Sequence, residues 1–325
     1  MRARKANLRY RSTVFIVLAG LLTIILTSYS PLSLATREAR KPSPPSDKVG
    51  AVATSQSKSS FPYMLMPVGA NVQLTPWGGA IHSILESGRP VGPGPLISVN
   101  AASFADKLAP ESIVAGFGSK LATTTQSAQS QPLPITLAGT SVMVVDSAGI
   151  ARFALLLFVS PSQINYIMPA GTSDGLATVD VIPEGGGSVI ASGGAQVTSI
   201  APGIFTVSGT GSPPTAAGQW LRYSGGGLVD SESLETPIAF GDPGDKVYLV
   251  LYGTDIRDRS SLSAVSATVG GRSAVVEYVG PQGSLVGLDQ ANILIPRSLV
   301  GAGQINVVVT VDGVAANTVK VTAGK

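Results

Sequence analysis

The sequence predicts an all-β protein with two tandem immunoglobulin-like β-sandwich domains, at residues 96–208 and 244–325. From Leu96 onward, short runs rich in Val, Ile, Thr and Tyr alternate with turns rich in Gly, Pro, Asn, Asp and Ser. No apolar pattern with a 3.6-residue period extends beyond about two turns, which argues against long helices. A set of motifs also occurs twice in the same order, and each copy is roughly 100 residues long, the size of an immunoglobulin-like sandwich.

Residues 1–35 have the order of a secretory signal. A basic leader precedes the uncharged run Val14–Leu26, and Ser33-Leu34-Ala35 places small residues at −3 and −1 of a cut before Thr36. The alternative is an uncleaved membrane anchor, because residues 13–35 are uncharged and long enough to span a bilayer. Both interpretations place the rest of the chain outside the cytoplasm: extracellular, periplasmic or at the cell surface. Membrane contact is then expected only through residues 13–35.

The segments between this signal and the sandwiches differ in composition. Residues 36–60 are rich in Lys, Arg, Ser, Pro and Gln without an apolar period, which is typical of a disordered linker. Residues 61–95 contain an apolar cluster together with many Gly and Pro, and we expect an extended lead-in packed on the first domain. Residues 209–243 are expected to form a connector with a hairpin between the two domains.

Composition and charge exclude several classes of function. The 325 residues contain no Cys and one His, which excludes disulfides, thiolate zinc sites, Cys nucleophiles and sites that need two imidazoles. Residues 1–60 carry 10 Lys and Arg against 2 Asp and Glu, whereas residues 61–325 carry 12 against 17. The predicted folded part is therefore mildly acidic, which argues against binding to nucleic acid.

The internal repeat centres on a QxNxxxP motif. The motif residues are Gln163, Asn165 and Pro169 in the first copy and Gln290, Asn292 and Pro296 in the second. Upstream, Gly118 matches Gly253, each after an apolar strand, and Gly139 matches Gly270. Gln and Asn two positions apart project to one face of a strand. We expect this pair to satisfy the backbone groups of a crossing loop, and the alternative is an exposed pair that binds a sugar.

Further motifs along residues 96–322 point to a family. They are VNAASF at residues 99–104, PxSIV ending in FG at 110–118, PLPxTLxGTSV at 132–142, VSPSQIN at 159–165, APGIFT at 201–206, GDxVxLxxYGT at 244–254, QANxxIP at 290–296 and VVTVDGVAANTV at 308–319. The chain resembles the secreted Solibacter-type C-terminal β-sandwich domain family of Acidobacteria, which is similar to IPT/TIG immunoglobulin-like domains. The resemblance implies export and no assigned activity, and it supplies no catalytic residues. Here the module follows only a short linker, which puts in doubt a role as the tail of a large upstream domain.

The sequence contains no set of residues that predicts catalysis, a metal site or a cofactor. The sequence lacks the phosphate-binding P-loop, the dinucleotide-binding motif GxGxxG and the zinc-protease motif HExxH. His82 is expected to be a surface or packing residue. Asp242 and Asp245 precede one predicted strand and Asp255 follows it, so they cannot form one acid–base pair. A loop calcium site at Asp255 and Asp258 is an alternative, but Arg257 and Arg259 are expected to pair with these carboxylates. The acidic group Asp230, Glu232 and Glu235 is expected to be a solvated loop.

Aromatic residues supply the remaining candidates for ligand binding. Trp220 and Tyr223 lie in a Gly-rich hairpin and could form a platform for a sugar, with core packing as the alternative. The sequence therefore favours an exported, non-enzymatic module for surface adhesion, scaffolding or protein interaction, with an unknown protein or glycan as its partner. A carbohydrate-binding module is the alternative function, and a hydrolase with a carboxylate site is a third hypothesis.

Overall fold

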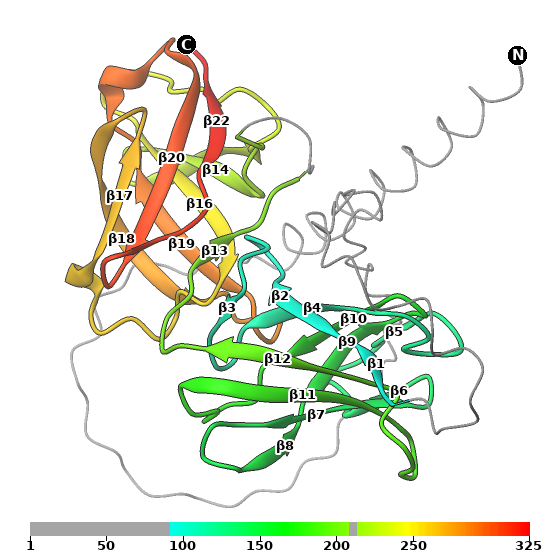
Figure 1. Cartoon of the computed structure of the whole chain (residues 1–325). Helices are drawn as coiled ribbons and strands as arrows, with labels where there is room; N and C mark the ends of the chain where they lie inside the picture. The colour runs from blue at the N-terminus through cyan, green and yellow to red at the C-terminus, as the bar shows by residue number, and fades with distance from the viewer. Residues whose placement is uncertain (1–91, 208–212) are drawn as a thin grey trace, which may run out of the picture. The chain divides into compact units, whose positions relative to one another are not determined.

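Alternating apolar and polar residues form strands throughout the described chain, which is all-β. The structure is a computed structural model, and it describes residues 92–207 and 213–325 (Figure 1). These residues all belong to one unit, Leu65–Lys325, whereas a second unit, Met1–Met64, lies outside the described residues. The predicted signal or anchor, the linker, most of the lead-in and His82 also lie outside them. Within residues 92–207 and 213–325, no helix is long and apolar enough to cross a membrane.

The first half of the described chain, residues 92–202, forms two sheets. The larger has seven strands: β1 (Gly94–Pro95), β3 (Lys107–Leu108), β6 (Thr136–Leu137), β7 (Thr140–Val145), β8 (Ala151–Phe153), β11 (Gly175–Pro183) and β12 (Ala191–Val197). The smaller has five: β2 (Ile97–Asn100), β4 (Ile113–Phe117), β5 (Gln126–Ser127), β9 (Leu155–Val159) and β10 (Gln163–Ile167). Alternate side chains of both sheets meet in one hydrophobic core, as in a β-sandwich.

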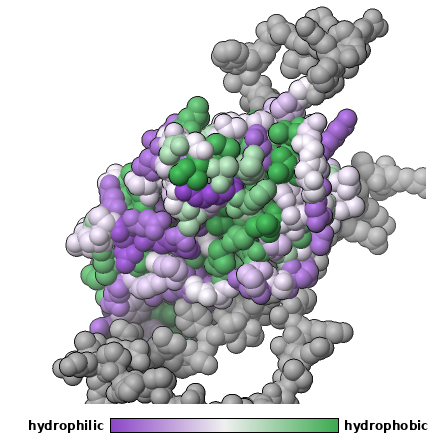
Figure 2. All heavy atoms as spheres, turned by 90° about the horizontal axis from the view of Figure 1, so that it is seen from below, coloured by the Kyte–Doolittle hydropathy of each residue, from purple (hydrophilic) through white to green (hydrophobic). Residues whose placement is uncertain are grey.

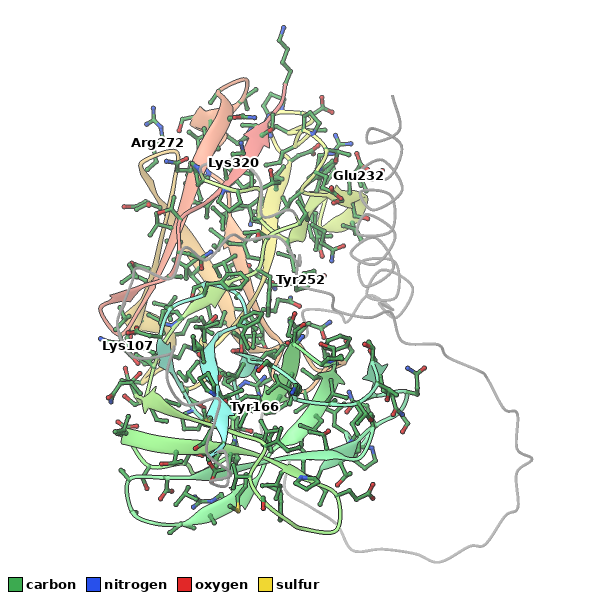
Figure 3. All side chains as sticks on the ribbon, turned by 45° about the vertical axis from the view of Figure 1, so that its right-hand side comes forward. Lys107, Tyr166, Glu232, Tyr252, Arg272 and Lys320 are labelled. Carbon is green, nitrogen blue, oxygen red and sulfur yellow. The ribbon has the colours of Figure 1, made fainter. Side chains whose placement is uncertain are left out.

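Tyr166 shows how this first core tolerates a polar atom. Its ring is buried between the sheets, and its hydroxyl donates a hydrogen bond to Ser98 Oγ at 3.0 Å (Figure 3). Burial raises the pKa of Tyr166 far above its ordinary value. The hydroxyl therefore stays protonated and bonded, as a buried polar group requires.

The second half, residues 203–207 and 213–325, forms one ten-stranded sheet that encloses its own core. Its strands are β13 (Gly203–Ile204), β14 (Gly218–Ser224), β15 (Gly227–Ser233), β16 (Lys246–Thr254), β17 (Val265–Val269), β18 (Arg272–Pro281), β19 (Asp289–Leu294), β20 (Gly303–Val311), β21 (Val314–Ala315) and β22 (Val319–Ala323). The two helices of the described residues, η1 (Leu262–Ala264) and η2 (Arg297–Leu299), are single 3-10 turns. The long strand β18 pairs with β17 at its start and with β19 further along, so the sheet folds back on itself.

The predicted connector belongs to this second core. The segment contributes Trp220, Leu234, Ile238 and Phe240 to the buried cluster, and its hairpin, β14 with β15, pairs with β16. The hairpin is therefore part of the sheet, and the residues after it pack on the same core. The division of the chain into domains at residues 208 and 243 stays a prediction.

The repeated motifs occupy equivalent strand pairs in the two halves. β4 pairs antiparallel with β10, and β16 pairs antiparallel with β19. In both pairs, the motif glutamine lies opposite the aromatic residue that precedes the motif glycine: Gln163 faces Phe117, and Gln290 faces Tyr252. The same register in both halves supports an internal duplication.

A β-bulge also recurs at the motif. On the other side of the motif strand, β9 pairs with β10 and β18 pairs with β19. In both pairings the register shifts directly after the motif asparagine, because the neighbouring strand carries one extra, unpaired residue there. The extra residue is Leu157 beside Asn165 and Glu277 beside Asn292. A bulge increases local twist and bends its strand, and both halves use it beside the same amide side chain.

One predicted equivalence within the repeat is wrong. The sequence match pairs Gly139 with Gly270, but strand pairing does not. β7 pairs with β8 and β11, just as β17 pairs with β18 and β20, so β7 is the equivalent of β17. The turn at Gly270 therefore corresponds to the turn from Asp146 to Ile150, one strand later than Gly139. Both glycines have positive φ, which explains why their local sequences look alike.

The last hairpin turns at an Asp-Gly pair, a dipeptide that is typical of tight two-residue hairpin turns. Asp312 and Gly313 join β20 to β21 with φ values of 46° and 81°. Two consecutive residues with positive φ make the turn whose twist matches that of the flanking strands.

Candidate functional site

The structure separates the two aromatic residues of the predicted sugar platform. Trp220 is 2% exposed and packs in the second core, so its ring offers no surface to a ligand. Tyr223 lies three positions further along the same strand and therefore projects to the opposite face. The expectation that these two residues act together is wrong, because strand geometry places them on different sides of the sheet.

Tyr223 instead meets a tyrosine from the neighbouring strand. Its ring packs edge to face on that of Tyr248, with ring centroids 5.7 Å apart and planes at 90°. The hydroxyl of Tyr248 donates to Glu277 Oε1 at 3.1 Å. Partial burial and this carboxylate raise the pKa of Tyr248 to about 12. Both rings remain partly exposed, so this pair has the accessibility that Trp220 lacks.

An apolar row surrounds this pair on the outer face of the sheet. Leu221, Tyr248, Leu294 and Val275 are cross-strand neighbours on β14, β16, β19 and β18. Adjacent residues on the same strands, such as Leu249 and Ile293, point into the core. We call the outer surface the tyrosine face, formed by Leu221, Tyr223, Leu228, Tyr248, Val275, Tyr278 and Leu294.

The tyrosine face includes large apolar side chains that are open to solvent. Val275 is 59% exposed, Leu228 is 46% exposed and Tyr278 is 38% exposed. The hydroxyl of Tyr278 donates to the carbonyl of Pro281 at 2.7 Å. On the edge strand β15, Glu232 is exposed and lies opposite Trp220, so it belongs to the other side of the sheet. The acidic group beside the tyrosine face is therefore Glu277, which bonds to Tyr248.

A second set of exposed apolar residues lies on the outer face of the seven-stranded sheet. Leu176 is 68% exposed and Phe153 is 48% exposed, whereas their strand neighbours Ala177 and Ala154 point into the first core. The view from below mixes hydrophobic and hydrophilic side chains (Figure 2). Single apolar residues of this kind are common on protein surfaces.

The amide pairs of the repeated motif are inside the structure. Gln163 Nε2 donates to Asn165 Oδ1 at 2.8 Å, and Gln290 Nε2 donates to Asn292 Oδ1 at 2.7 Å. Gln163, Asn165 and Gln290 are buried, and Asn292 is partly exposed. Their burial leaves little access for a sugar, and their structural role stays a prediction.

The motif glycines mark places where backbone segments approach closely. A Cβ atom at Gly253 would lie 2.5 Å from the carbonyl oxygen of Gly203, and one at Gly118 would lie 2.9 Å from that of Pro95. Contacts this short are not seen for real Cβ atoms. The two positions therefore require glycine because a neighbouring chain crosses there, and their backbone φ values are ordinary. The prolines Pro169 and Pro296 each lie one residue beyond the position that follows a motif strand, after Met168 and Ile295.

The carboxylates that flank β16 have separate structural partners. Asp245, before the strand, accepts a hydrogen bond from the backbone N–H of Asp242 and pairs with Arg222 at 3.4 Å. Arg222 also pairs with Asp230 at 3.1 Å. Asp230 and Glu232 lie on strand β15, which corrects the expectation of a solvated loop for these two residues, whereas Glu235 lies exposed in the turn after the strand.

At the other end of β16, Asp255 lies in a buried junction between the two halves. Asn100 Nδ2, from β2, donates to Asp255 Oδ2 at 2.8 Å and also to the carbonyl of Ala201 at 2.9 Å. Thr254 Oγ1 accepts from the backbone N–H of Ile113 at 2.9 Å and donates to the carbonyl of Gly287 at 3.0 Å. This junction joins residues more than a hundred positions apart in sequence.

The predicted ion pairs at this junction are wrong. Arg257 pairs with Asp289, with Nε 2.7 Å from Oδ1, and approaches Glu111 at 3.9 Å, rather than pairing with Asp255 or Asp258. Arg259 donates to the backbone carbonyl of Arg257. Sequence reasoning missed Asp289, although it directly precedes the second QxN motif and could have been noticed there.

Metal-ligating side chains do not cluster in the described part of the chain. No group of three or more His, Cys, Asp or Glu side chains in residues 92–207 and 213–325 is placed to hold a metal ion. The buried polar side chains described above hydrogen-bond to one another or to the backbone. The feature best suited to contact another molecule is the tyrosine face.

Two comparisons with known proteins give no further guidance. No protein-family model matches the chain, and no curated protein matches it significantly. The function therefore has to be argued from the residues themselves.

Proposed function

We propose that this protein is an exported, non-enzymatic module that acts in adhesion, scaffolding or protein interaction at the cell surface. The observation that carries the proposal is the tyrosine face, where an apolar row crosses four paired strands and leaves Val275 and Leu228 open to solvent. Large apolar side chains gathered on one face favour contact with another molecule. Tyrosine adds a ring and a hydroxyl, a combination that is frequent in binding surfaces.

Two sequence features support a location outside the cytoplasm. The predicted signal or anchor at residues 1–35 favours export, and the resemblance to secreted Solibacter-type β-sandwich domains favours the same compartment. The absence of Cys from the chain is compatible with folding either inside or outside the cell, because no disulfide is needed.

A carbohydrate-binding module is the second candidate. Tyr223 and Tyr248 present partly exposed rings, and the carboxylate of Glu277 holds the hydroxyl of Tyr248 at the same face. Aromatic rings stack on the apolar faces of sugars, and a carboxylate accepts hydrogen bonds from sugar hydroxyls. In this alternative the sugar platform is formed by Tyr223 and Tyr248, and Trp220 takes no part in it.

The test compares two lysine substitutions at exposed apolar strand positions. Val275→Lys alters the tyrosine face, and Leu176→Lys is the matched control on the seven-stranded sheet. Both side chains are well exposed, so each variant should keep its stability to within about 0.5 kcal/mol. Binding of the purified proteins to envelope fractions is then measured as a function of concentration. We expect saturable binding that Val275→Lys weakens at least about tenfold and Leu176→Lys leaves unchanged.

The nature of the ligand is decided by a glycan array and a screen for hydrolysis. Binding to defined glycans that Tyr248→Ala abolishes would establish the carbohydrate-binding alternative. Loss of envelope binding without any glycan signal would favour a protein partner. Turnover of a hydrolase substrate by the purified protein would contradict the non-enzymatic proposal.

A further inference from the structure

The junction between the two halves is organised around one asparagine with all of its hydrogen-bonding groups in use. Asn100 Oδ1 accepts from the backbone N–H groups of Ala102 and Ser103, at 2.8 and 2.9 Å. These bonds fix the orientation of the amide, because only its oxygen can accept. Its nitrogen must then point at Ala201 and at Asp255, to which it donates.

Asp255 is held at this place by its backbone as well as by its side chain. The residue is 3% exposed and has a φ of 64°, a left-handed conformation that Asp and Asn tolerate better than other residues with a side chain. It directly follows Thr254, whose hydroxyl bonds both to Ile113 of the first half and to Gly287 of the second. The carboxyl group therefore has little freedom to turn towards solvent.

The charges around Asp255 do not balance a buried anion. The charged group that acts on it is Asp289 at the start of β19, and the side chains of Asn100 and Ser112 act on it as hydrogen-bond partners. Arg257 after β16 lies between Asp289 and Glu111. The guanidinium of Arg257 is bound to Asp289, and no ion pair among the described residues includes Asp255. A buried carboxylate without a cation is costly, and taking up a proton removes that cost.

We propose that Asp255 carries a proton in the folded protein and forms a proton-dependent latch between the two halves. Oδ2 accepts from Asn100, so we place the proton on Oδ1; the side chain of Ser112 and the backbone of Ala109 also interact with this carboxyl group. When the proton is released to solvent, the junction must hold two carboxylates beside one guanidinium. Burial of this second anion disfavours the closed junction relative to an open one in which the carboxylate is hydrated, although the hydrogen bond from Asn100 itself favours the anion.

The direction of the pH dependence follows from the environment of the carboxyl. Burial raises the pKa of Asp255 well above its usual range, and the carboxylate of Asp289 raises it further, while hydrogen bonds with Ser112 and Asn100 act in the opposite direction. A raised pKa in the closed state means that closure is favoured at low pH. This stabilisation is lost as the pH rises from the ordinary pKa, about 3.9, to the raised value, and no further loss follows above it.

The experiment measures the opening of the junction directly. The backbone N–H of Ile113 donates to Thr254 Oγ1 across it, so its hydrogen-exchange protection reports closure. Protection is measured by NMR in the full-length protein between pH 4 and 8, with the intrinsic exchange rate divided out. Asp255→Asn removes the ionisation and suits the left-handed backbone. Asp312→Asn is the matched control, because Asp312 also has positive φ but is exposed and bonds to Ser260.

We expect protection of Ile113 to fall by up to about tenfold per pH unit between the two pKa values, since one proton is coupled to opening. Asp312→Asn should keep this slope, and Asp255→Asn should remove it. An unchanged slope in Asp255→Asn would overturn the latch. If Asp255→Asn does not fold, the pKa of Asp255 is measured in the wild-type protein from the ¹³C chemical shift of its carboxyl group as the pH is varied. An ordinary pKa would also overturn the proposed latch.

Discussion

Replacing Asn165 with alanine tests whether the repeated motif supports the fold. Asn165 is fully buried and accepts a 2.8 Å hydrogen bond from Gln163 Nε2, which is itself buried. The substitution removes the acceptor and leaves the amide of Gln163 without this bond. Such a loss costs about 1–3 kcal/mol. For a chain of this size, the melting temperature should fall by about 2–10 °C.

The assay is urea denaturation of Asn165→Ala beside Asn292→Ala, with the midpoint and the slope fitted separately. Asn292 makes the equivalent bond but is partly exposed, so its loss should cost less. A double variant that also replaces Gln163 should recover part of the loss, because both partners of the bond are then gone. Unchanged stability of Asn165→Ala, together with lost ligand binding, would refute the structural interpretation.

Three further predictions follow from the geometry. Gly253→Ala should destabilise the protein by about 1–3 kcal/mol, since β13 must move away from the new Cβ, whereas Gly244→Ala, with open space around its Cα, should be nearly neutral in the same denaturation assay. Tyr248→Ala should weaken envelope binding without lowering the melting temperature by more than a few degrees; a fall in stability as large as that of Gly253→Ala would mean that the tyrosine face is mainly structural. Hydrogen bonds from Ile150 and Arg152 hold the pKa of Asp146 below its usual range. Asp146 thus stabilises the fold above its ordinary pKa, and this contribution is lost as the pH falls. Asp146→Asn should be less stable than the wild type near neutral pH, and the difference should shrink below about pH 4 in thermal melts; a constant difference would contradict this assignment.

Local patterns were sufficient to predict the strands and the turns. Alternation of apolar and polar residues, together with Asp312-Gly313, gave the last hairpin, and the spacing of Gln and Asn gave the repeated motif. The register of the motif strands then proved to be the same in both halves. These features depend on residues that are close in sequence or on a repeat that is visible in it.

Long-range partners could not be predicted in the same way. Asn100 and Asp255 are 155 positions apart, and nothing local to either residue indicates the other. The match of Gly139 with Gly270 failed because two turns of similar sequence lie one strand apart in the fold. The pairing of Trp220 with Tyr223 failed for a simpler reason, since residues three apart on a strand face opposite sides.

The most direct test of the proposed function is the location of the folded chain in the producing cell. The protein has no cysteine, so Leu176→Cys introduces a single thiol at a position that is 68% exposed. Cells are treated with a maleimide that cannot cross the cytoplasmic membrane, before and after that membrane is broken. We predict labelling while the cytoplasmic membrane is intact. Labelling only after it is broken would contradict an exported module.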